Sequence, residues 1–238
     1  MKSFVVATSE YKRLNKSVIL LIGIVLIVFA PILLDPSILI TNLKPSKAVI
    51  YSYLHLACLY GAFFIPLQTF SLYYHDENTD VLKIIYSNPI LPFQYVIGKC
   101  IGAFFNFIQF VLFTSIIIIV NRIFLDKSFN VVLEFINGFF MYLLPSIFFY
   151  IILTHFIQAI CRNSIISVII SIFLFLGYEG LHEKFRFVIR GEYLQNLQYS
   201  LALSKELIMI LLMNRIFYIA AGILLLLVTI SIHSRKKI

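Results

Sequence analysis

Long, unbroken runs of apolar residues limit most strongly how this chain can fold. A helix needs roughly 20 mostly apolar residues to cross the hydrocarbon core of a bilayer. The 238-residue chain is 61% apolar and only 13% charged, which is more apolar surface than one soluble core could bury. Strands of a membrane barrel would alternate apolar and polar residues over about ten positions, so the runs predict helices. Six spans are expected, at residues 17–34, 49–73, 97–120, 132–157, 165–181 and 216–233.

The pattern therefore predicts an all-α integral membrane protein with a single transmembrane domain over residues 1–238. Residues 1–16 mix apolar and basic side chains, which is typical of a short helix in the membrane interface; a fraying tail is the alternative. The connection 182–214 is long, and its second half is largely apolar. An external re-entrant hairpin and an outward extension of the sixth helix both fit this stretch.

The distribution of Lys and Arg indicates the orientation. If the N-terminus is cytoplasmic, the cytoplasmic side carries ten Lys and Arg residues, against four in the short external loops. The external number rises to nine once the connection between the fifth and sixth spans, through Arg215, is included. Cytoplasmic loops are enriched in these residues, and the first span usually dominates. Both termini are thus expected in the cytoplasm. The net charge of +8 would reflect contact with anionic lipid headgroups, and no nucleic-acid partner is expected.

The connection between the second and third spans, residues 75–96, has the most informative pattern. Asp76 and Glu77 open it, and acidic residues suit a helix N-terminus. Apolar residues follow at roughly helical spacing until Pro89, which would end the helix. The pattern predicts a short amphipathic helix along the cytoplasmic membrane surface. Because its two ends are tied to two spans, a push on this helix would tilt both.

This segment resembles the permeases of ABC type-2 transporters. The shared pattern is an acidic start, an apolar helix, Ser-x-Pro and then Gly-Lys at the mouth of the next span. The tight basic turn at 161–164, Cys-Arg-Asn-Ser, is also similar to the family. Asp80 departs from the pattern, since the family often has Gly near this position. The matching residues are Glu77, Leu82, Ile84, Ile85, Ser87, Pro89, Gly98 and Lys99.

The resemblance implies the membrane subunit of a bacterial ABC exporter in the plasma membrane. Two permease chains, identical or related, would pair and carry two cytoplasmic ATPase subunits, which bind the ATP and Mg. The chain itself has no Gly-rich phosphate loop with a Lys, so no cofactor and no enzyme activity are expected in it. A hydrophobic or amphipathic substrate would move outward. The residues implied in docking the ATPase are Glu77, Asp80, Leu82, Lys83, Ile85, Tyr86, Ser87 and Pro89.

Polar residues inside the predicted spans are further candidates, because they are costly at membrane depth. Asn106 and Gln109 lie three residues apart and share a helix face. They could line a substrate path or a dimer seam, or simply form hydrogen bonds between helices. His155 lies near the cytoplasmic end of the fourth span and Glu179 at the outer end of the fifth. The step from Glu179 to His182 could hold a metal only with ligands from other helices, so no metal site is expected.

Two other classes of function remain as alternatives. The first is a membrane immunity or sensor protein that binds a toxic peptide without pumping it. The second is an intramembrane enzyme, which would need paired glutamates, zinc-binding histidines at helical spacing, or a deep Ser or Asp nucleophile. The sequence shows no such set, so the enzyme ranks last.

Overall fold

The computed structural model of the chain describes residues 2–35, 45–78, 91–126, 129–179 and 205–235. Every regular element in these ranges is helical. Two of them, η1 and η2, are π-helical turns inside longer helices, where one extra residue widens the turn. The elements are α1 (Lys2–Asn15), α2 (Val18–Gly23), η1 (Ile24–Phe29), α3 (Ala30–Leu34), α5 (Ser46–Asn78), α7 (Pro92–Asp126), α8 (Asn130–Gly138), η2 (Phe139–Leu143), α9 (Leu144–Cys161), α10 (Ser164–Glu179) and α12 (Lys205–Arg235).

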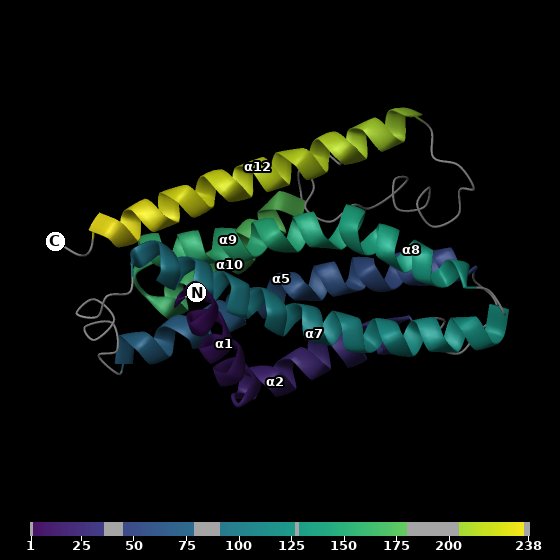
Figure 1. Cartoon of the computed structure of the whole chain (residues 1–238), viewed down its shortest axis with the longest axis horizontal. Helices are drawn as coiled ribbons and strands as arrows, with labels where there is room; N and C mark the ends of the chain where they lie inside the picture. Colours follow the sequence, from purple (N-terminus) through teal and green to yellow (C-terminus); the bar gives the residue numbers. More distant parts are fainter. Residues whose placement is uncertain (1, 36–44, 79–90, 127–128, 180–204, 236–238) are drawn as a thin grey trace.

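The long helices run side by side along the long axis of the molecule (Figure 1). Helix α5 packs against α7, α9 and α10, while α12 packs mainly on α9. Helix α1 packs chiefly on α7 and crosses the bundle in its left half, and α12 ends on the same side (Figure 1). The ends of α5 and α9 and the start of α7 therefore share one end of the bundle with the end of α12.

The apolar helices indicate a multi-pass membrane protein, as the sequence predicted. Four helical stretches are long and apolar enough to cross a bilayer: Ser46–Tyr74, Pro92–Leu125, Asn130–Cys161 and Met209–Arg235. A fifth span is possible if α1 and the helix Val18–Leu34, which meet at a 75° bend, count together. Helix α10 is apolar over Ser164–Gly177 but shorter than the others. The predicted number of six spans is therefore not confirmed.

The ends of two helices differ from the sequence-based boundaries. The second span was expected to end at residue 73 and the third to begin at 97, but α5 continues to Asn78 and α7 begins at Pro92. Asp76 thus lies in the last turns of α5 and does not open a new helix. The rest of the predicted coupling segment up to the start of α7, residues 79–90, lies outside the described residues, so the coupling helix stays a prediction.

The apolar stretch before the last span was left open between a hairpin and a helix extension. Helix α12 is continuous from Lys205 through Arg215 to Arg235. From Lys205 onward, the connection is therefore part of the last helix. This finding favours the extension, while residues 182–204 lie outside the described residues.

The turn at 161–164 follows from its residues. Arg162 adopts a left-handed conformation (φ 54°) and donates its N–H to the Gln158 carbonyl, which closes α9. The Asn163 side chain then accepts hydrogen bonds from the backbone N–H groups of Ile165 and Ile166. Such a cap satisfies the first free donors of α10, so two antiparallel helices are joined in two residues.

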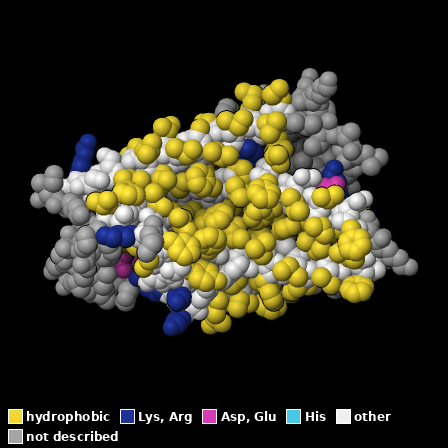
Figure 2. Space-filling view, viewed as in Figure 1, with side chains coloured by type: hydrophobic (Ala, Val, Ile, Leu, Met, Phe, Trp, Pro, Cys, Tyr) yellow, Lys and Arg dark blue, Asp and Glu magenta, His cyan; other side chains and the backbone are white. Residues whose placement is uncertain are grey.

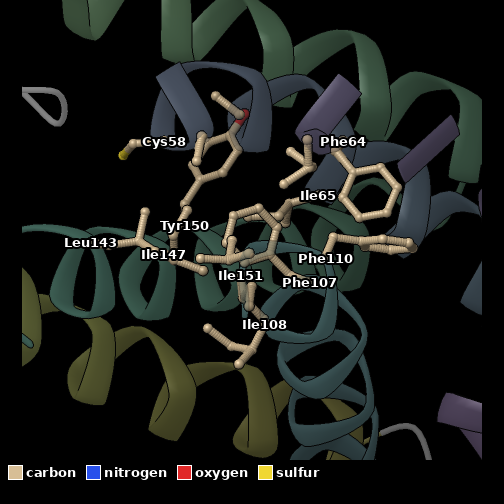
Figure 3. Packing of buried hydrophobic residues seen from close by; sticks show 14 of the residues in the cluster. Cys58, Phe64, Ile65, Phe107, Ile108, Phe110, Leu143, Ile147, Tyr150 and Ile151 are labelled. Atoms are coloured by element: carbon tan, nitrogen blue, oxygen red, sulfur yellow. The ribbon is translucent and has the colours of Figure 1, made fainter. Parts of the chain in front are cut away.

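The buried core lies between α5, α7 and α9. Figure 3 shows Phe64 and Ile65 of α5 facing Phe107 and Phe110 of α7. The rings of Phe64 and Phe110 meet edge to face, with centroids 5.6 Å apart. In lipid, such van der Waals packing is what holds helices together. The outer surface is also apolar over a broad area (Figure 2), as expected for a lipid-facing protein.

Candidate functional site

Four charged side chains from α1, α5 and α7 meet at one end of the bundle. Arg13 of α1 contacts Glu10 at 2.7 Å and Asp76 of α5 at 2.9 Å. Lys99 of α7 contacts Asp76 at 2.6 Å and Glu10 at 3.2 Å. We call Glu10, Arg13, Asp76 and Lys99 the charge cluster. Two acids and two bases make its formal charge zero, which is the condition for burying such groups at tolerable cost.

Lys99 is the most deeply buried member of the charge cluster, with a side chain that is 0% exposed. Its ammonium has three hydrogens to donate, and it has three acceptors: Asp76, Glu10 and the Leu72 carbonyl at 2.6 Å. The ammonium also lies over the ring of Tyr73, 4.6 Å from its centroid. A buried lysine with all its donors engaged fixes the start of α7 to the end of α5.

Asp76 is equally well held, and its side chain is only 2% exposed. One carboxylate oxygen accepts from Arg13, and the other accepts from Lys99 and from the Tyr95 hydroxyl at 2.7 Å. Burial alone would raise the pKa of Asp76. The charge of Lys99, the hydrogen bonds from Lys99 and Tyr95, and the charge of Arg13 together outweigh it, so the pKa lies below its usual value.

This lowered pKa predicts how stability changes with pH. A carboxyl whose pKa is depressed on folding contributes stability above its unfolded pKa of about 3.9, and loses it as the pH falls through the folded value. We expect the wild type to be more stable than Asp76→Asn between pH 5 and 7, and this difference to shrink below about pH 4. Thermal unfolding of the wild type and of Asp76→Asn in detergent, between pH 3 and 7, measures the difference in stability and its dependence on pH. A difference that does not change with pH would contradict the assignment.

Helix α1 approaches α7 closely because two glycines, Gly98 and Gly102, lie one turn apart on α7. A Cβ at Gly98 would come within 2.6 Å of the Val6 Cβ and 3.0 Å of the Ser3 carbonyl oxygen. At Gly102 it would come within 2.9 Å of the Glu10 Cβ. Small residues four apart are the usual means by which helices in membranes come into backbone contact. Here they let Glu10 reach Lys99.

Gly98→Ala should therefore separate α1 from α7. Neither the Val6 Cβ nor the Ser3 carbonyl can move without its backbone, so we expect a loss of about 1–3 kcal/mol in the free energy of unfolding. Gly177→Ala on α10 is the matched control, because nothing lies within 4 Å of its Cβ position. Alanine is the better helix former by about 1 kcal/mol, so the control should be neutral or stabilising. Equal stability of the two variants in detergent would rule out the tight contact.

A layer of amide side chains adjoins the charge cluster. The side-chain oxygen of Asn15, Oδ1, accepts from Asn106 at 2.9 Å and from Gln109 at 2.5 Å. Gln68 of α5 donates to Asn106 at 2.5 Å, and the Tyr11 hydroxyl donates to Gln109 at 2.5 Å. Asn106 and Gln109 thus do share a face, and they bind α1 and α5 within one chain.

The remaining candidate residues from the sequence are not brought together in the described part of the chain. His155 lies on α9, where its Nδ1 is 2.9 Å from the Ile151 carbonyl and its ring meets that of Tyr73 edge to face. Glu77 and Glu179 belong to α5 and α10, but their side chains are not described. The other docking candidates, Asp80, Leu82, Lys83, Ile85, Tyr86, Ser87 and Pro89, lie outside the described residues.

Three members of the charge cluster were not singled out from the sequence. Arg13 was counted only as a cytoplasmic charge, Asp76 as a helix-opening acid, and Glu10 not at all. The spacing of Glu10 and Arg13, three residues apart on one helix, indicates an ion pair. The paired glycines of α7 indicate a close helix contact. Together these two patterns could have placed α1 on α7.

In comparisons with known proteins, no family model, no curated protein and no solved structure matches this chain. Within the described ranges, no group of three or more His, Cys, Asp or Glu side chains is placed to hold a metal ion. The charge cluster and the segment 79–90 beside it are therefore the features from which a function is proposed.

Proposed function

We propose that this chain is the membrane-spanning permease subunit of an ATP-driven ABC exporter. The observation that carries the proposal is the charge cluster. It joins α1 to the end of α5 and to the start of α7, the two helices on either side of segment 79–90. This is the segment whose sequence resembles the coupling helix of ABC type-2 permeases.

The charge cluster fixes the positions of the two helix ends that flank this segment. Asp76 lies three residues before residue 79, and Lys99 lies in the second turn of α7, which begins at Pro92. A buried ion pair cannot be pulled apart without leaving a buried charge uncompensated, at a cost of about 3–5 kcal/mol. A push on segment 79–90 would therefore move α5, α7 and α1 together. Such rigid linkage is what a subunit driven from outside the membrane needs.

The proposed partners are those that the family resemblance implies. Cytoplasmic ATPase subunits would dock on segment 79–90 and bind the ATP and Mg, while a second permease chain, identical or related, would complete the transporter. The chain would lie in a bacterial plasma membrane with six spans, α1 in the interface and both termini in the cytoplasm. The substrate would be hydrophobic or amphipathic, such as a peptide, a lipid or a drug-like molecule.

Copurification tests this proposal. The tagged chain, solubilised in a mild detergent that preserves membrane complexes, should recover a P-loop ATPase that mass spectrometry identifies. Leu82→Asp combined with Ile85→Asp should lose the ATPase, because charges cannot enter an apolar docking groove without a partner. Phe129→Asp, at the opposite end of the bundle and 75% exposed, should retain it. Recovery of no ATPase with the wild type would refute the proposal.

A further inference from the structure

A groove lies at the elbow where α1 turns into α2. The two helical segments meet at 75°, which leaves space between the elbow and the side of α7. The groove has a volume of about 660 Å³, within the range of ligand sites. Its polar end is formed by Asn15 and Gln109, and its apolar length by Leu20, Ile24, Val28 and Phe113. A second groove of about 340 Å³ shares Gln109 and continues along α1 past Tyr11.

The polar end of the elbow groove is flanked by positive charge. Lys12 lies in the last turn of α1 and Lys16 directly follows the end of this helix, and both side chains are exposed. Tyr11, which directly precedes Lys12, lines the second groove, and Asn15, which directly precedes Lys16, lines the elbow groove. The nearest acid on the same helix, Glu10, is buried and already paired with Arg13 and Lys99. Figure 2 shows Lys and Arg side chains near this elbow, next to the apolar surface.

We infer that the elbow groove binds one anionic phospholipid from the leaflet at which α1 lies. The phosphate lies between Lys12 and Lys16, the glycerol esters lie near the amides of Asn15 and Gln109, and one acyl chain lies along Ile24, Val28 and Phe113. Basic pockets beside membrane helices favour anionic headgroups in this way, at about 1 kcal/mol per Lys or Arg. The inference needs only that the helices cross a bilayer, and it does not depend on the proposed transport function.

Native mass spectrometry of the full chain in detergent tests the inference. Phosphatidylglycerol and phosphatidylcholine with identical acyl chains are titrated separately, and bound lipid is counted. We expect one phosphatidylglycerol to bind about tenfold or more tightly than phosphatidylcholine, since two lysines face its charge. The variant with Lys12→Gln and Lys16→Gln should lose this preference and keep its phosphatidylcholine binding. Ile24→Trp, which fills the apolar length, should weaken both lipids.

Two controls test whether the preference for phosphatidylglycerol depends on Lys12 and Lys16. Arg235→Gln removes an exposed charge at the end of α12 and should leave the preference intact. Thermal unfolding of each variant without lipid checks that the fold is retained, which is expected because Lys12 and Lys16 are exposed. Equal binding of the two lipids by the wild type would overturn the inference. The inference would also be overturned if the preference for phosphatidylglycerol survived both lysine substitutions, or if Arg235→Gln removed this preference to the same extent.

Discussion

Lys99→Met should lower the free energy of unfolding by about 3–5 kcal/mol, the usual cost of removing one partner from a buried ion pair. Methionine keeps much of the volume of lysine but leaves the buried Glu10 and Asp76 with Arg13 as their only cation in the charge cluster. The Leu72 carbonyl also loses a donor. Unfolding of the purified chain by heat or denaturant in detergent measures the loss.

Two further variants separate the loss of charge balance from a loss of packing. Adding Glu10→Gln to Lys99→Met returns the charge cluster to zero net charge, so part of the lost stability should be regained. Arg235→Met removes an exposed positive charge in the last turn of α12, and should change stability by less than about 0.5 kcal/mol. If Lys99→Met were as stable as Arg235→Met, the charge cluster would not hold α1, α5 and α7 together.

The second large effect is expected in transport. Leu82→Asp combined with Ile85→Asp should reduce ATP-dependent efflux to background, because the variant segment can no longer dock while the bundle stays intact. Efflux, or protection against the exported compound, is compared in cells that contain equal amounts of membrane-inserted protein. Phe129→Asp makes a similar change at the other end of the bundle, on an exposed residue, and should keep normal efflux.

The same comparison distinguishes the exporter from its main rival. A membrane immunity or sensor protein that binds a toxic peptide without pumping it needs no ATPase. It would keep its protection when Leu82 and Ile85 are changed. Full protection by the double variant, with no dependence on ATP, would therefore favour the passive binder over the permease.

The helical membrane fold could be predicted from the sequence because it depends on local properties. Runs of about 20 apolar residues leave lipid as the only adequate environment, and α5, α7, α9 and α12 follow from them. The lengths of these helices could not be predicted as well. Helix α5 continues to Asn78, since Asp76 is buried by partners on other helices, and a hydropathy pattern does not show such partners.

The candidate site could be predicted only in part. Lys99 was singled out because it belongs to the Gly-Lys pattern at the start of the third span. The three-residue spacing of Asn106 and Gln109 predicted that they share a helix face. Their partners Glu10 and Asn15 come from a helix some 90 residues earlier in the chain. That contact depends on how closely two backbones approach at Gly98, which is a property of the packed helices. The position of α1 therefore had to come from the structure.

Photo-crosslinking from segment 79–90 in native membranes shows whether an ATPase docks on this segment. A photoreactive amino acid replaces Leu82 in one version of the chain and Phe129 in another, and crosslinked proteins are identified by mass spectrometry. We expect a crosslink from position 82 to a P-loop ATPase and none from position 129. Absence of an ATPase crosslink at position 82, in membranes where the chain is active, would contradict it.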